Sequence, residues 1–200
     1  QAAAETKKDP KLRALKEVVE GRLPLFVSCD SATAIGHVRA ILEKYPKVRL
    51  VLVNGFGLTG EEDWLAEKQV SVIVRTAANP LDKAAMKLNW AGIAKLAEKG
   101  VPIALGGTCA NSFGAREDML WNSAEMMRVL HDSEKVLSMV TSTPAKILGL
   151  EGQTGAIREG LRADLVLWSA NPMETWQARV IRTYMGGRVI YREGDEMKCM

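Results

Sequence analysis

The chain has 200 residues, of which 47% are hydrophobic and 26% charged, and its net charge is +3. These values are ordinary for a globular protein with a sizeable core, organised as one domain or as one domain with a small appendage. The basic residues form no run or single face, so nothing favours nucleic-acid binding. No stretch approaches the length of about eighteen apolar residues that a membrane-spanning helix needs.

The cysteine content bears on the redox compartment of the chain, and the first residues bear on whether it is part of a longer protein. Cys29, Cys109 and Cys199 are too few and too scattered for a disulfide framework, so we expect a reducing compartment such as the cytoplasm. The chain starts Gln1-Ala-Ala-Ala and lacks the charged and apolar segments of a signal peptide. The simplest interpretation is a fragment, a processed product or a subunit of something longer.

Most of the first 149 residues alternate between short apolar runs and segments of helical periodicity. Strands are predicted at 24–28, 48–53, 70–75 and 101–105, and helices at 11–20, 31–45, 59–68, 81–99, 116–130, 133–140 and 144–148. Ser31 and the Thr59–Glu62 pair are expected to cap two of these helices. Apolar strands that are each followed by a helix indicate an α/β fold with a parallel sheet covered on both faces.

After Gly149 the pattern changes to β structure. Glycines at 155 and 160 permit tight turns, and strands are predicted at 164–168 and within 179–192. Gly186-Gly187, between two apolar runs, predicts a hairpin turn.

Four segments of the last third form one combined pattern. They are Val140-Thr-Ser-Thr-Pro-Ala-Lys-Ile-Leu-Gly-Leu150, Gly155-x-Ile-x-x-Gly160-x-x-Ala163-Asp164-Leu-Val-Leu-Trp168, Asn171-Pro172, and Val180-x-x-x-Tyr-Met-Gly-Gly-Arg-Val-Ile-Tyr191. This pattern resembles the C-terminal end of the amidohydrolase superfamily, on its imidazolonepropionase-like side. Upstream, residues 23–30 and 48–53 resemble the fifth and sixth βα units of the same family.

The resemblance implies a (β/α)8 TIM-type barrel flanked by a small β-sandwich built from both chain ends. Since a complete barrel has eight strands and this chain offers four, it resembles the second half, about strands five to eight. The implied organisation is a lead-in and helix at 1–21, a half-barrel at 22–149 and C-terminal sandwich strands at 150–200. We expect an N-terminal half of the same protein or a partner chain to complete it, because open parallel edges are costly.

The resemblance also implies an activity, the hydrolysis of carbon–nitrogen bonds other than peptide bonds. In the family, a divalent metal such as zinc lowers the pKa of a bound water, and a carboxylate takes its proton. The ligands include two histidines after the first barrel strand, which this chain lacks. Further ligands are often histidines after strands five and six and an aspartate after strand eight.

The matching positions in this chain carry other residues. Ser28 in Val27-Ser28-Cys29-Asp30 stands where the family often has histidine, and the segment after Asn54 has no histidine either. After the fourth strand, Thr108 or Cys109 takes the place of the aspartate. The barrel-mouth pocket candidates are therefore Ser28, Cys29, Asp30, Asn54, Thr108 and Cys109, with no metal site expected in this chain. A non-catalytic pseudoenzyme or a small-molecule-binding scaffold is the alternative function.

Other residues invite functional hypotheses with simpler structural alternatives. Cys29 and Cys109, with Asp30, would make a soft metal site or a reactive thiol pair, unless they are buried apolar filler. His37 and His131 lie within or near helices and not after strands, which favours a structural or solvent-facing role. The glycine loops at 55–60 and 106–107 match no complete phosphate-binding motif, and Asp164 is expected to be a structural turn residue.

Overall fold

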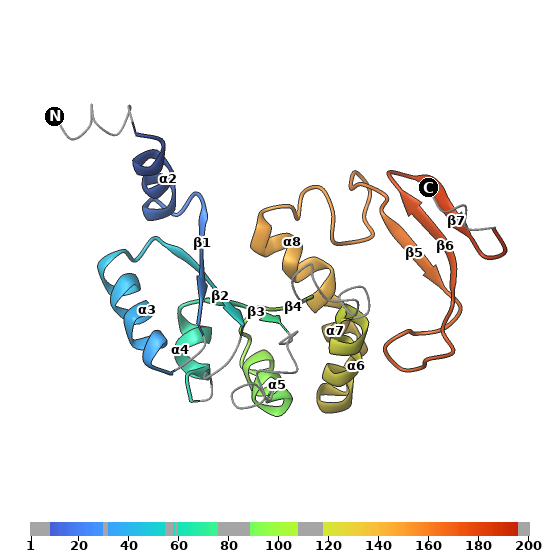
Figure 1. Ribbon diagram of the computed structural model, residues 1–200, viewed down its shortest axis with the longest axis horizontal. Helices are drawn as coiled ribbons and strands as arrows, with labels where there is room; N and C mark the ends of the chain where they lie inside the picture. The colour runs from blue at the N-terminus through green and yellow to red at the C-terminus, as the bar shows by residue number, and fades with distance from the viewer. Residues whose placement is uncertain are drawn as a thin grey trace, which may run out of the picture. The chain divides into compact units, whose positions relative to one another are not determined.

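The structure, a computed structural model, describes residues 9–29, 32–54, 58, 60–75, 89–107 and 118–195, with the backbone alone at 32, 54 and 75. The chain divides into two compact units, Gln1–Gly106 and Gly107–Met200, coloured blue to green and yellow to red in Figure 1. Within the described residues, no helix combines the length and the apolar character needed to cross a membrane.

The first unit is built around a parallel sheet of strand order β1-β2-β3-β4, as the alternating pattern predicted. Its elements are α2 (Pro10–Val19), β1 (Pro24–Ser28), α3 (Ala32–Lys44), β2 (Arg49–Asn54), α4 (Glu62–Glu67), β3 (Ser71–Arg75), α5 (Trp90–Glu98) and β4 (Ile103–Gly106). All four predicted strands of this unit are confirmed, with small shifts at their ends. Each crossover contains a helix, which is the connection that parallel strands require.

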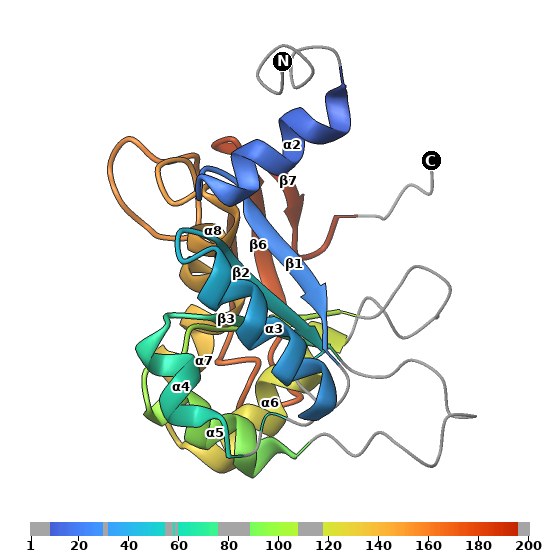
Figure 2. The same ribbon diagram turned by 90° about the vertical axis from the view of Figure 1, so that its left-hand side faces the viewer.

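The two faces of this sheet are covered unequally within the unit. Helices α3, α4 and α5 lie on one face (Figures 1 and 2), and the side chains on one set of alternating positions are buried: Leu50, Leu52, Val72, Val74, Ile103 and Leu105. On the second face, Val51 and Ala104 are buried, but Phe26 is 45% exposed and Ser28 is exposed. Successive strand residues point to opposite faces, so these apolar strands place apolar side chains on both faces of the sheet.

Two helix starts differ from the sequence predictions. Helix α4 begins at Glu62, later than predicted, and its N-cap residue Glu61 makes no side-chain cap bond; the expected cap Thr59 lies outside the described residues. The predicted single helix over 81–99 is also wrong, because Asn89 is non-helical and its side chain accepts a 3.0 Å bond from the Gly92 amide. That Asx cap starts α5 at Trp90, and residues 81–88, like the expected cap Ser31, lie outside the described part.

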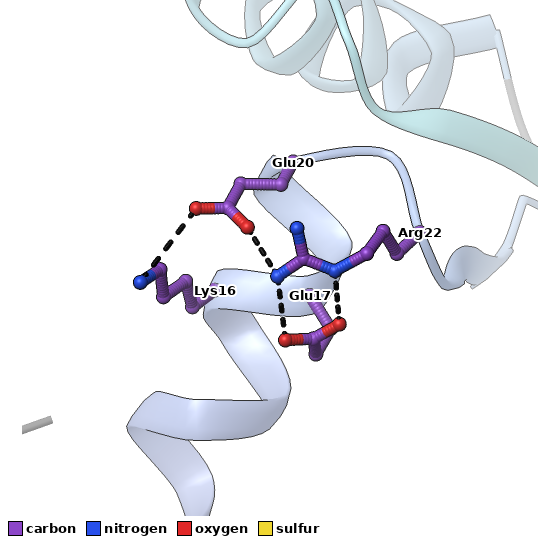
Figure 3. Close-up of polar contacts among 4 residues, drawn as sticks. All are labelled: Lys16, Glu17, Glu20 and Arg22. Carbon is purple, nitrogen blue, oxygen red and sulfur yellow. Dashed lines mark hydrogen bonds and ion pairs between the residues drawn. The ribbon is translucent and has the colours of Figure 1, made fainter. Parts of the chain in front are cut away.

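A cluster of charged side chains fixes the turn from α2 into β1 (Figure 3). The Glu17 carboxylate accepts hydrogen bonds from Nε and Nη2 of Arg22, and Glu20 pairs with Arg22 and with Lys16, the latter at 3.8 Å. The hydrogen bond from Arg22 holds the pKa of Glu17 below its usual value. Because the cluster is solvent-exposed, we expect it to set the direction of the chain more than to add stability.

The second unit consists of three helices followed by an antiparallel sheet of order β5-β6-β7. Its elements are α6 (Asp118–Leu130), α7 (Ser133–Val140), α8 (Ser142–Leu148), β5 (Leu165–Trp168), β6 (Val180–Met185) and β7 (Arg188–Arg192). The predicted hairpin is confirmed, with positive φ angles of 55° at Gly186 and 79° at Gly187. Two successive positive φ values match the twist of a two-residue hairpin loop.

The stretch before β5 holds this hairpin in place. The Asp164 carboxylate accepts a 2.8 Å hydrogen bond from the Gly186 amide, and the Ala163 carbonyl accepts one of 2.9 Å from the Gly187 amide. The Gly186 amide, followed by Arg162, lowers the pKa of Asp164. Asp164 therefore has the structural turn role that the sequence indicated.

The sheet β5-β6-β7 contains no buried residue among its strand positions. Val166 is 49% exposed and its neighbour Leu167 is 51% exposed. Since neighbouring strand residues point to opposite faces, the described residues of this unit leave apolar surface open on both faces.

Candidate functional site

The carboxyl ends of the parallel strands form the edge at which an α/β protein carries its site. Ser28 ends β1 and pairs with Val53, and Asn54 ends β2 and pairs with Val74. Arg75 pairs with Gly106 at the ends of β3 and β4. The structure thus brings two of the predicted site residues, Ser28 and Asn54, to one edge of one sheet.

Ser28 and Cys29 are neighbours in sequence but have different surroundings. Ser28 is exposed and shares the second face of the sheet with Phe26. The Cys29 amide continues the ladder with a 3.0 Å hydrogen bond to the Val53 carbonyl, but its side chain is 0% exposed. A fully buried thiol meets neither solvent nor substrate, so the arrangement favours the apolar-filler alternative for Cys29.

The other predicted site residues are not located. Asp30, Thr108 and Cys109 lie outside the described residues, and for Asn54 only the backbone is described. Of the two histidines, His37 is exposed on α3, and His131 is exposed after α6 with a φ angle of 52°. Neither follows a strand of the sheet, in keeping with the structural or solvent-facing role expected for them.

The described residues do not fit a metal centre by themselves. No group of three or more His, Cys, Asp or Glu side chains in this part of the chain is placed to hold a metal ion. A zinc site needs three or four such ligands at about 2.0–2.3 Å. We therefore derive no metal-dependent step from these residues.

A concave feature in the second unit was missed by the sequence predictions. It is a groove of about 880 Å³ between α6, α7, α8, the turn at 154–157 and β5. Its lining is mostly apolar, and it includes Leu137, Leu148 and Ile157, of which Ile157 is 89% exposed. The charged pair Arg162–Asp164 borders it but is already engaged in holding the hairpin. Among the described residues that line the groove, no group of His, Cys, Asp or Glu side chains is placed to hold a metal ion.

Sequence and structure together define an α/β protein built around a parallel sheet. The defining pattern of the amidohydrolase family matches residues 3–190. The chain belongs to the amidohydrolase family.

The relatives of this chain include deaminases and an imidazolonepropionase. Over 141 residues the chain is 27% identical to the 5-methylthioadenosine/S-adenosylhomocysteine deaminase of Desulforudis audaxviator, covering 62% of this chain and 32% of that protein. It is 30% identical over 107 residues to the imidazolonepropionase of Thermoplasma acidophilum, covering 50% of this chain and 26% of the relative. The matched segments thus span about a third of these relatives or less.

Solved structures show the same fold relationship. An amidohydrolase from Thermotoga maritima aligns with a TM-score of 0.77 and 32% identity, covering 92% of this chain and 47% of that one. An adenosine deaminase from Xanthomonas campestris with bound zinc aligns with a TM-score of 0.60 and 20% identity, covering 90% and 47%. The chain therefore spans about half the length of these structures.

Proposed function

We propose that this chain forms one half of an amidohydrolase that hydrolyses carbon–nitrogen bonds other than peptide bonds. The half comprises about strands five to eight of a (β/α)8 barrel, followed by C-terminal strands of a β-sandwich. The observation that carries the proposal is the parallel sheet, whose second face runs from half-exposed Phe26 to exposed Ser28 at the carboxyl edge. In a closed barrel this face would be the interior and this edge the active-site mouth.

An N-terminal half of the same protein or a partner chain completes the barrel in this proposal. Strands β1 and β4 each pair with one described strand only, which leaves two parallel edges available. Parallel sheets are stable when both faces are covered, and closure removes the edges. The chain also spans only 47% of the Thermotoga relative, so the remainder of that protein is the right size to be the missing half.

A non-catalytic scaffold that binds a small molecule is the second candidate. It is favoured by Ser28, which presents a neutral hydroxyl at the position where the family pattern often has histidine. An uncharged hydroxyl is a poor ligand for zinc but a good hydrogen-bonding group for a polar ligand.

Co-expression with the N-terminal half of the Thermotoga maritima amidohydrolase separates the two candidates. If the chain is half of a hydrolase, we expect a one-to-one complex of the two halves that contains zinc, iron or manganese. This complex should release ammonia from adenosine or 5-methylthioadenosine. A complex with less than one-tenth of an equivalent of metal and no ammonia release would support the scaffold.

The variant Ser28→His sharpens this comparison, because it restores a ligand of the family pattern. If the mouth lies at this edge, the variant complex should hold more metal than the unchanged complex. A matched histidine on the outer helix face, His37→Ala, should leave metal content unchanged. Equal metal content in all three complexes would count against the placement of the mouth at Ser28.

A further inference from the structure

The last residue of β3 brings an arginine to the second face of the parallel sheet. Val72 and Val74 are buried on the face that the helices cover, and Arg75, one residue further, belongs to the opposite set of alternating positions. Arg75 pairs with Gly106 where β3 and β4 end. The backbone register therefore places Arg75 at the edge where the barrel mouth is proposed.

The strand positions around Arg75 on this face are neutral. One register row runs across all four strands: Ser28, Val53, Ile73 and Ala104. The next row towards the carboxyl edge pairs Arg75 with Gly106, which has no side chain. Among the described strand positions of these two rows, Arg75 is the only charged residue. The rows thus combine one positive charge with three apolar side chains and one hydroxyl.

Other charged residues belong to other parts of the sheet. Arg49 shares the second face, but it lies at the amino end of β2, opposite Pro24. Asp30 is the carboxylate closest in sequence to a carboxyl end of these strands, and it follows β1, which β2 separates from β3. No carboxylate occupies a strand position beside Arg75 in the described sheet.

A single positive charge among apolar side chains favours one kind of ligand. A guanidinium stays charged in proteins, and enclosing a charge is costly unless a counter-charge pairs with it. A carboxylate balances one guanidinium and accepts two parallel hydrogen bonds from it. A phosphate dianion would leave a net negative charge among apolar groups, which is unfavourable.

We propose that Arg75 makes this site specific for a small molecule that carries a single carboxylate on an apolar body. The inference rests on the proposed function, and it names the class of substrate for the hydrolase or of ligand for the scaffold. The carboxylate would pair with the guanidinium of Arg75. The apolar body would cover Val53 and Ile73, which are only half-buried.

Three probes of similar size test the charge of the ligand: phenylacetate, the neutral phenylacetamide, and phenyl phosphate at pH 8. Each is titrated by NMR into the chain alone and into its complex with the N-terminal half of the Thermotoga maritima amidohydrolase. In the complex, phenylacetate should bind at least about tenfold more tightly than phenylacetamide. It should also bind more tightly than phenyl phosphate. The chain alone should show the same order with weaker binding, because its second face is open to solvent.

Arg75→Met and Arg49→Met provide the matched comparison, because each removes one positive charge from the same face, at opposite ends of the sheet. Arg75→Met should lose the preference for phenylacetate, whereas Arg49→Met should keep it. Arg75→Lys should keep part of it, because the charge remains but the planar, two-pronged donor is lost. Circular dichroism first verifies that the four proteins have equal secondary structure.

The outcomes separate this inference from the proposed function. No binding of phenylacetate, equal binding of phenylacetamide, tighter binding of phenyl phosphate, or an unchanged preference in Arg75→Met would each overturn the inference. If the two halves associate without the preference, the completion of the barrel stands and the assignment of Arg75 fails. If the halves do not associate but the chain alone prefers phenylacetate through Arg75, the assignment stands and the completion fails.

Discussion

The hydrogen bond from the Gly186 amide to Asp164 ties the hairpin turn to the segment before β5 at 2.8 Å. Because this bond lowers the pKa of Asp164, its stabilising effect is complete above the unfolded carboxyl pKa of about 3.9 and is lost as pH falls through the folded value. We predict that protection of the Gly186 amide against hydrogen exchange falls steeply below about pH 4.

Asp164→Asn supplies the control for this pH dependence. The asparagine side-chain oxygen still accepts from Gly186 but does not titrate, so the variant should show weaker protection that no longer changes steeply in acid. A parent protein whose Gly186 protection is as insensitive to acid as that of the variant would contradict the role of the carboxylate.

Cys29 gives a second prediction at this scale. Its side chain is 0% exposed, so alkylation should be at least about a hundredfold slower in native buffer than in denaturant. Mass spectrometry of the peptide that contains Cys29 measures this rate separately from those of the other two cysteines. Rapid alkylation of Cys29 in native buffer would contradict its burial and support a reactive thiol.

The sequence predicted candidate site residues, but it did not predict the surroundings of Ser28 and Cys29. Ser28 and Cys29 are adjacent and both follow an apolar run, so the sequence alone placed them in one pocket. Because successive side chains along an extended chain point to opposite faces, Ser28 is exposed and Cys29 is buried. The sequence does not show that Arg182 lies opposite Arg192, because the register of β6 against β7 is set by the turn and by a bulge.

At the scale of elements, the loop around Gly155 is fitted closely to α8. Gly155 has a φ angle of 94°, and an added Cβ would lie 2.6 Å from the Ala145 Cβ. Gly155→Ala should therefore combine backbone strain with overpacking and cost about 3 kcal/mol of unfolding free energy. Urea unfolding followed by tryptophan fluorescence measures it.

Gly160→Ala is the matched variant for this loop. Gly160 has a φ angle of 83°, but an added Cβ would have no heavy atom within 4 Å. Only the backbone strain remains, so the expected cost is about 1 kcal/mol. Equal costs for the two variants would show that the contact with α8 contributes nothing.

Strands were predicted more reliably than helix ends, for a physical reason. Apolar runs such as 70–75 and 101–105 are short and bounded, so they identify β3 and β4 without knowledge of their neighbours. Helical periodicity continues through Asn89, and only the cap to Gly92 shows that a helix starts there. Asparagine is compatible with both a helix interior and a cap, and local competition between them decides.

At the scale of the whole molecule, exposed apolar surface predicts how the chain behaves without a partner. Phe26 is 45% exposed on edge strand β1, on the second face of the sheet. We expect the isolated chain to bind a hydrophobic dye and to self-associate, as measured by fluorescence and light scattering. Phe26→Gln should weaken both, whereas Leu52→Gln, at a site buried under helices, should instead unfold the unit. A monomer that binds no dye would contradict the open face.

Ser28 at the end of β1 is exposed and Cys29 directly after it is buried, so the side chain that this edge exposes depends on the register of the strand. A shift of β1 by a single residue against β2 would turn every side chain of the strand to the other face. The Ser28 hydroxyl would then be buried and the Cys29 thiol exposed. A one-residue shift would thus replace an exposed hydrogen-bonding group with an exposed nucleophile at this edge. Which side chain this edge exposes is thus set by strand register as much as by residue type.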